Sequence, residues 1–233
     1  MGCVRWKFNS SYPDKVKNQK EIIDNTANFV RAKFEGEGSG HDWWHIWRVW
    51  QLAKRIGKEE KTNSLVVELA ALLHDIADWK FNNNDIHAGG KATEKWLSGQ
   101  GLDKPTIDQI VEIVNNVSFK GSGVKDNMKT LEGKVVQDAD RLDAMGAMGI
   151  ARVFAYGGYK GRTMYDPETS IHMANSFEAY KSGGQTSINH FYEKLLLLKD
   201  RMNTKTGKRL AKGRDLFMRV YLKNFYNEWK GKK

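Results

Sequence analysis

Hydrophobic residues recur through most of the chain at the three- and four-residue spacing that is typical of amphipathic helices. In the first half, this pattern predicts helices over 21–34, 41–58, from Asn63 to Ile76 and over 88–97, followed by one that has Pro105 in its first turn. Asn63 belongs to the residue types that cap helix N-termini. The helix that follows it is apolar on almost every side, so we expect it at the centre of the fold.

In the second half, the helical pattern is interrupted by two long polar loops. The loops are predicted over 119–133 and 156–170, and both contain glycines. The segment 134–154 between them has helical spacing, but its glycines weaken the prediction of one unbroken helix. Two further helices are predicted in the tail, joined near Thr204. No stretch alternates with the period of a β-strand, and no repeat or low-complexity linker divides the chain. We therefore predict an all-α fold of one domain over residues 1–233.

The composition is that of an ordinary globular protein with a basic surface. Of the 233 residues, 40% are hydrophobic and 28% are charged. Lysine and arginine number 38 against 28 aspartates and glutamates, which gives a formal net charge of +10. An excess of this size suits an anionic partner such as a nucleotide, a nucleic acid or an acidic membrane surface, and it carries no information about the fold.

Cysteine usage and hydropathy favour a cytoplasmic protein. Cys3 is the single cysteine, which excludes an intramolecular disulfide and fits a reducing compartment. No apolar run reaches the roughly 18 to 20 residues that are needed to cross a bilayer. The first residues lack the apolar stretch of a secretory signal. We therefore expect a cytoplasmic location and no membrane partner.

Histidines and aspartates in three helical segments are candidates for a metal site. Because no cysteine pair is present, a transition metal would have to be bound by histidine and carboxylate. His74 and Asp75 lie where an apolar helix ends, and polar groups there need a partner. His45 is on the preceding helix, and antiparallel packing would bring it to the same end. The best candidates for a further ligand are three aspartates that crowd one apolar segment, namely Asp138, Asp140 and Asp143.

The order His45, then His74 and Asp75, then Asp140, resembles the pattern of the HD-domain metal-dependent phosphohydrolases. The strings "GHDWWHIWRVW", "AALLHDIADWKF" and "VVQDADRLDAMGAMGIARVF" are similar to one bacterial subgroup of predicted nucleotide phosphohydrolases. This resemblance covers roughly residues 40–225. It implies one HD-type helical bundle with additional C-terminal helices. Its metal-site core would span about 21–155, and the C-terminal extension about 171–229.

The resemblance also implies a ligand set. His45, His74, Asp75 and Asp140 would hold one divalent metal ion, with manganese as the first choice and magnesium, iron, cobalt, nickel or zinc as alternatives. The His-Asp pair at 41–42 would then not bind the metal, and His74 and Asp75 would be the metal-binding pair. We expect Asp42 to stabilise the positive N-terminus of its helix. His41 could still approach the metal ligands or a phosphate, because it is four residues before His45.

Three residues are candidates for the rest of the catalytic machinery. Asp78 follows Asp75 by three residues and could accept a proton from metal-bound water, and the resemblance supports this because these enzymes often place an acid just after the pair. Arg48 is on the same helical face as His45 and could bind a phosphate, or it could form a salt bridge. Lys120, in "SFKG", could clamp a phosphate from the first long loop.

Other residues near the motifs have two open interpretations. Asp143, one turn after Asp140, could orient a ligand histidine. The tryptophans around the His-Asp pairs could stack a nucleobase, although core packing is the favoured prediction for most of them. These are Trp43, Trp44, Trp47 and Trp79.

These features favour a divalent-metal-dependent phosphohydrolase that acts on a small-molecule nucleotide. The resemblance implies hydrolysis of a nucleoside triphosphate to its monophosphate and pyrophosphate. One alternative is a phosphodiesterase acting on cyclic nucleotides or oligonucleotides. Another is a non-catalytic basic protein that binds nucleic acid, which is disfavoured because no nucleic-acid-binding signature is present. The sequence is compatible with a homo-oligomer.

Overall fold

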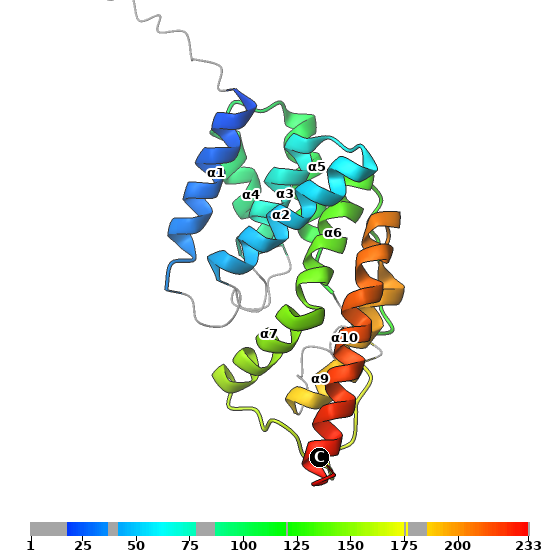
Figure 1. The fold of residues 1–233 in the computed structure, drawn as a ribbon. Helices are drawn as coiled ribbons and strands as arrows, with labels where there is room; N and C mark the ends of the chain where they lie inside the picture. The colour runs from blue at the N-terminus through cyan, green and yellow to red at the C-terminus, as the bar shows by residue number, and fades with distance from the viewer. Residues whose placement is uncertain are drawn as a thin grey trace, which may run out of the picture.

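All the regular elements that the structure describes are helices, which confirms the all-α prediction (Figure 1). The computed structural model describes residues 18–36, 42–77, 87–119, 121–174, 176 and 186–232. The elements are α1 (Gln19–Lys33), α2 (Trp43–Glu60), α3 (Ser64–Leu73), α4 (Ala88–Ser98), α5 (Lys104–Asn116), α6 (Leu131–Asp143), α7 (Gly146–Tyr159), α9 (Ser187–Glu193), the 3-10 helix η2 (Leu195–Arg201) and α10 (Lys205–Trp229). None of the described helices is long and apolar enough to span a membrane.

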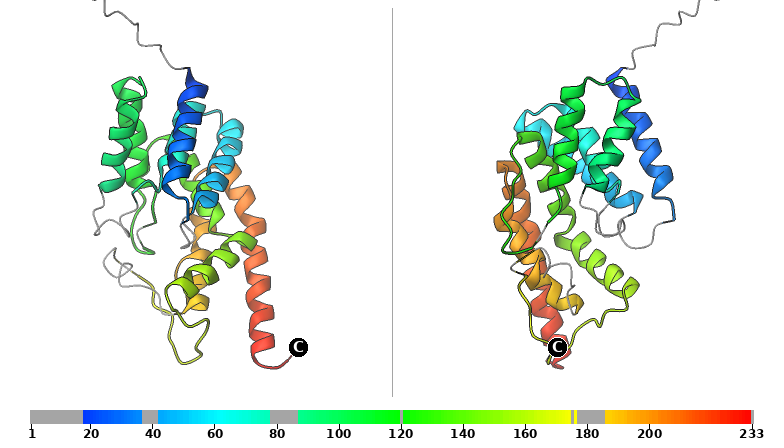
Figure 2. Two further views of the ribbon diagram at one scale, coloured as in Figure 1. Left: turned by 90° about the vertical axis from the view of Figure 1, so that its left-hand side faces the viewer. Right: turned by 180° about the vertical axis from the view of Figure 1, so that it is seen from behind.

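Helix α3 lies inside a bundle that is formed by the first six helices. It contacts α1, α2, α5 and α6, and almost all of its side chains are buried, as its apolar sequence predicts. Helices α7, α9 and α10 extend from one end of this bundle, and α10 runs along its side (Figures 1 and 2). The boundaries 21–155 and 171–229 that we gave for a core and an extension stay predictions.

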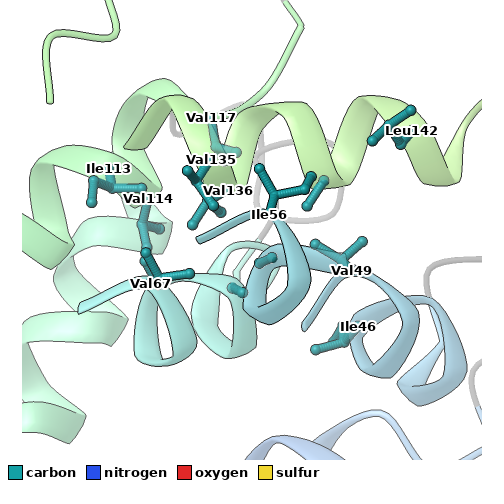
Figure 3. Close-up of a cluster of buried hydrophobic side chains, with 14 of the residues drawn as sticks. Ile46, Val49, Ile56, Val67, Ile113, Val114, Val117, Val135, Val136 and Leu142 are labelled. Carbon is teal, nitrogen blue, oxygen red and sulfur yellow. The ribbon is translucent and has the colours of Figure 1, made fainter. Parts of the chain in front are cut away.

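Branched aliphatic side chains from four segments fill the space between α2 and α6 (Figure 3). Ile56 of α2 lies beside Val135 and Val136 of α6, Ile46 and Val49 lie further along α2, and α3 and α5 add further side chains. Each of these five is fully buried, and burying one such side chain stabilises the fold by roughly 1.5–3 kcal/mol. This packing fixes α2 against α6, and these two helices carry His45 and Asp140.

Capping side chains determine where several helices begin. Asn63 accepts hydrogen bonds from the Leu65 and Val66 amides, which confirms it as the cap of α3. Asp42 caps α2, so this helix begins at Trp43 and not at residue 41. Thr130 caps α6, which therefore begins three residues before the predicted 134. Caps work through local hydrogen bonds that hydrophobic spacing does not reveal.

The predicted helical segment 134–154 is two helices, with a sharp turn at Ala144 and Met145. Gly146 has a φ of +69°, a left-handed conformation that favours glycine. A Cβ atom on Gly149 would lie 2.2 Å from the Ala144 carbonyl oxygen, so the close turn requires glycine there as well. The turn sends α7 out of the bundle, toward α9 and α10.

The N-terminus of α10 is attached to both α2 and α6. Thr204 caps α10 through the Gly207 amide, and the tail elements meet there as predicted. The first tail element is the short α9 followed by η2. The Thr206 amide donates to Glu60 at the end of α2 over 2.8 Å. The buried Asp138 carboxylate of α6 accepts from the amides and side chains of Asn203 and Thr204.

Candidate metal centre

The two histidines of the predicted ligand set meet at one end of an antiparallel helix pair. His45 is in the first turn of α2, and His74 follows the last residue of α3. Both side chains are buried, and His45 is only 1% exposed. Their Nε2 atoms are 3.3 Å apart. The structure therefore brings together two imidazoles that are 29 residues apart in the sequence.

The two carboxylates of the predicted set lie next to these imidazoles. Asp75 Oδ2 is 3.4 Å from His45 Nε2 and 3.6 Å from His74 Nε2. Asp140 Oδ1, from α6, is 3.6 Å from His45 Nε2 and 4.0 Å from His74 Nε2. His45, His74 and Asp140 each have one potential ligand atom, and these three atoms all lie within 4.8 Å of one another. All four predicted ligands thus direct an oxygen or a nitrogen toward the same small volume.

The hydrogen bonds of the imidazoles make this volume suitable for a cation. His74 Nδ1 is 2.7 Å from the Ala71 carbonyl oxygen, and His45 Nδ1 is 2.7 Å from Asp143 Oδ2. Since both partners are acceptors, Nδ1 must donate in each ring, and a neutral ring then has a lone pair at Nε2. Two such lone pairs 3.3 Å apart repel each other, and so do two nearby carboxylates. A divalent ion would relieve both repulsions, and two imidazoles with two carboxylates suit such an ion.

Asp143 is not part of the group but contacts it from behind. It is 1% exposed and lies against His45, Arg48 and Arg152. Burial opposes ionisation of Asp143, but the hydrogen bonds and charges of its three partners outweigh it, so its pKa is well below the usual range. Burial and the Arg152 charge lower the pKa of His45, but Asp143 and Asp75 outweigh them and raise it. The carboxylates around His45 therefore favour positive charge in this volume, which a bound cation would supply.

The remaining predicted residues divide between described and undescribed parts of the chain. Asp42 is the cap of α2 and accepts from the His45 amide over 2.9 Å, the helix-start role that we expected. Arg48 donates to Asp143 from Nε over 2.7 Å, so the salt bridge is formed, and a phosphate contact stays a prediction. Asp78, Lys120 and His41 lie outside the described residues.

Two of the tryptophans that we expected in the core are exposed. Trp44 and Trp47 are 56% and 41% exposed, and their rings contact each other edge to face. Trp43 is half-buried against the core, and Trp79 lies outside the described residues. Their exposure follows from their positions around the helix axis. Successive residues of a helix are rotated by about 100°, and the buried face of α2 contains Ile46 and Val49, so Trp44 and Trp47 lie outside that face.

Arg152 lies near the site through an ion pair with Asp143 that the motifs did not indicate. It reaches Asp143 from α7 over 3.1 Å. The two residues are nine positions apart, across the turn that separates α6 from α7. No helical periodicity extends through such a turn, so no spacing rule could have paired them. Only their shared position in "DRLDAMGAMGIAR" suggested that they are near each other.

Both the sequence and the structure match proteins of one hydrolase superfamily. Residues 43–145 match the family model of the HD domain. An HD-superfamily hydrolase from Bacillus thuringiensis is 41% identical, with a TM-score of 0.71 over 91% of this chain and 99% of that protein. The chain belongs to the HD superfamily. This HD protein is accordingly a metal-dependent hydrolase.

Two further relatives of the HD protein extend the match. YpgQ from Bacillus subtilis is 37% identical over 204 residues, which is 87% of this chain and 91% of YpgQ. The crystal structure of YpgQ in complex with ADP has a TM-score of 0.67 at 34% identity, over 88% of this chain and 97% of that one. A predicted HD-superfamily hydrolase from an uncultured Thermotogales bacterium is 25% identical, with a TM-score of 0.59 over 91% and 99%. The likeness therefore includes the C-terminal helices.

Proposed function

We propose that this HD protein is a phosphohydrolase that cleaves nucleoside triphosphates to the monophosphate and pyrophosphate, using one divalent metal ion, with manganese as the first candidate. The observation that carries the proposal is the convergence of two buried imidazoles, the buried Asp75 carboxylate and the partly exposed Asp140 carboxylate. His45, His74, Asp75 and Asp140 would hold the ion. When bound in such a site, a divalent ion lowers the pKa of a coordinated water and neutralises charge on a phosphoryl group.

The protein's own residues would contribute proton transfer and phosphate binding. Asp78 follows Asp75 closely in sequence and is our candidate for accepting the proton of the attacking water. Arg48 supplies a guanidinium that shares the partner Asp143 with His45, so this cation lies next to a candidate ligand. Lys120 begins the first long loop and is our candidate for binding the outer phosphates. A triphosphate gains more from these cations than a monophosphate, because it carries more negative charge.

A nucleotide substrate is supported by a relative and by charge. YpgQ, which matches most of this chain, binds ADP in its crystal structure. The net charge of +10 favours the approach of an anionic substrate. A cytoplasmic location, which the single cysteine favours, would expose the protein to nucleotides.

The decisive experiment is a substrate and metal screen that separates the two possible phosphorus-containing products. Purified protein is given Mn²⁺, Mg²⁺, Co²⁺ or Ni²⁺ with nucleoside mono-, di- and triphosphates, and in parallel with cyclic nucleotides and short oligonucleotides. Inorganic phosphate, pyrophosphate and nucleotide products are measured independently. We expect pyrophosphate from triphosphates, no reaction in EDTA, and recovery when metal is returned. Phosphate release from monophosphates at the same rate would indicate a phosphomonoesterase. Turnover of cyclic nucleotides or oligonucleotides alone would indicate a phosphodiesterase.

The phosphate-binding role of Lys120 has a matched control within the same loop. Lys120→Ala should raise the KM for triphosphates about tenfold, the equivalent of about 1.4 kcal/mol, and raise the KM for diphosphates less. Lys129→Ala removes an exposed lysine whose Nζ is 3.8 Å from Glu112, and it should leave both KM values unchanged. Equal effects of the two substitutions would mean that Lys120 acts only through the general charge of the loop.

A further inference from the structure

One buried carboxylate accepts from three donor side chains, one imidazole and two guanidinium groups, behind the candidate metal centre. Asp143 Oδ2 is 2.7 Å from His45 Nδ1, 3.1 Å from the Arg48 terminal nitrogen and 3.1 Å from Arg152. Its Oδ1 accepts from Arg48 Nε over 2.7 Å. The donors come from α2 and α7, whereas Asp143 is the last residue of α6. Three helices therefore converge on this side chain.

We propose that Asp143 is a positioning residue for metal binding: it fixes the imidazole of His45 so that Nε2 faces the metal, and it is kept from ligating the metal itself by Arg48 and Arg152. The proposal rests on the proposed function for the presence of a metal, and it adds a residue outside the four expected ligands.

The hydrogen bond to Asp143 selects one form of the His45 ring. A neutral imidazole has one N–H and one lone pair, and the carboxylate requires the N–H at Nδ1. The lone pair is then at Nε2, within 3.6 Å of Asp75, Asp140 and His74 atoms. The negative charge of Asp143 also makes Nε2 a stronger donor to a metal. In His74, the Ala71 carbonyl selects the same form without a charge.

The two arginines explain why Asp143 acts through His45 and not as a ligand. A carboxylate near a divalent ion would normally turn toward it, but both oxygens of Asp143 already accept charged donors. Asp140, one turn earlier on the same helix, has a side chain 28% exposed and lies beside both Nε2 atoms. One helix thus supplies a ligand and, three residues later, the support for another ligand.

Metal affinity in a conservative variant tests the proposal. Asp143→Asn keeps the shape but removes the charge, and its amide cannot accept from every donor that now surrounds the carboxylate. We expect the Kd for Mn²⁺, measured by calorimetry without nucleotide, to rise 10- to 100-fold. The matched control is Asp215→Asn, since Asp215 is also a buried carboxylate between two cations, Lys199 and Arg219. This control should cost stability but leave the Kd unchanged.

A second measurement on the unaltered protein covers the case in which Asp143→Asn does not fold. In protein loaded with diamagnetic Zn²⁺, nitrogen-15 NMR of the imidazoles should show His45 with its proton at Nδ1, protected from exchange. A proton at Nε2 would overturn the proposal, and so would a folded Asp143→Asn protein whose Mn²⁺ Kd is within about twofold of the original. If the protein binds metal but turns over no nucleotide, the proposed function fails while both measurements still decide the role of Asp143.

Discussion

Asp138 should be one of the most costly residues to replace in this protein, although it lies outside the metal centre. The side chain is fully buried and accepts four hydrogen bonds. Asn203 donates from its amide over 2.8 Å and from Nδ2 over 3.0 Å, and Thr204 donates from its amide over 2.8 Å and its hydroxyl over 2.7 Å. The perturbation that we consider is Asp138→Asn, which preserves the volume.

An asparagine amide cannot reproduce this arrangement in either orientation. One terminal atom becomes an NH₂ group, which then faces either the Asn203 amide or the Thr204 amide, so one buried backbone N–H loses its acceptor. Leaving such a group unpaired costs about 1–3 kcal/mol, and the remaining bonds lose their charge-assisted strength. Burying a neutral amide instead of a charge offsets part of this loss. We expect a net destabilisation of about 2–3 kcal/mol.

For a protein of this size, that loss corresponds to a fall in Tm of roughly 4–12 °C. Urea unfolding followed by circular dichroism measures the free energy, and calorimetry of Mn²⁺ binding to the folded variant should give an unchanged Kd. Asp108→Asn, which removes only an exposed partner of Lys104, should leave the Tm nearly unchanged. A loss below about 1 kcal/mol for Asp138→Asn, or a large loss of metal affinity, would refute the structural role.

Two further predictions follow from the site and from one half-buried acid. Asp75→Ala should abolish metal-dependent hydrolysis. Asp42→Ala should retain most of the activity but lose about 1 kcal/mol of stability, because Asp42 is a helix cap. An equal loss of activity in the two folded variants would contradict the choice of His74 and Asp75 over the pair at 41–42. Burial raises the pKa of Glu193, and the His172 amide and Arg162 oppose this shift only in part. The ionised form of Glu193 is therefore less favourable in the folded protein than in the unfolded chain. The free energy of unfolding should fall as the pH rises through the raised pKa. Glu193→Gln should therefore stabilise the protein more at about pH 7 than at about pH 4 in urea unfolding, and an equal effect at both values would contradict this sign.

Hydrophobic periodicity predicted most of the helices, and the antiparallel packing that we expected from it brought the two candidate metal-site histidines together. Helix α3 is apolar on all sides and has Asn63 before it, so its position at the centre and its start could both be inferred. Because His45 begins one helix and His74 ends the next, antiparallel packing alone brings them together. Spacing did not predict the break at Ala144, since the left-handed Gly146 is a backbone property that the residue type permits but does not require.

The resemblance implied that Asp140 is a ligand, and spacing suggested that Asp143 orients a histidine, but helical position alone did not distinguish the roles of the three neighbouring aspartates. Asp138, Asp140 and Asp143 lie within six residues of one helix, and all three looked like possible ligands. Their roles depend on partners elsewhere: Asn203 is 65 residues from Asp138, and His45 is 98 residues from Asp143. Among the described contacts of these three, those of Asp140 are with the Nε2 atoms of both histidines. Contacts at these separations are determined by the completed fold and not by local sequence.

The attachment of α10 to α2 and α6 has a consequence during synthesis on the ribosome. The chain emerges from its N-terminus, so Glu60 appears 146 residues before its partner Thr206. Until the tail emerges, Asp138 lacks its four donors, and the apolar surfaces that α10 covers with Ala211, Met218 and Leu222 face water. A nascent chain that ends before Asn203 therefore lacks the contacts that complete this side of the bundle. Chaperones that bind exposed apolar surface would associate with it until translation ends.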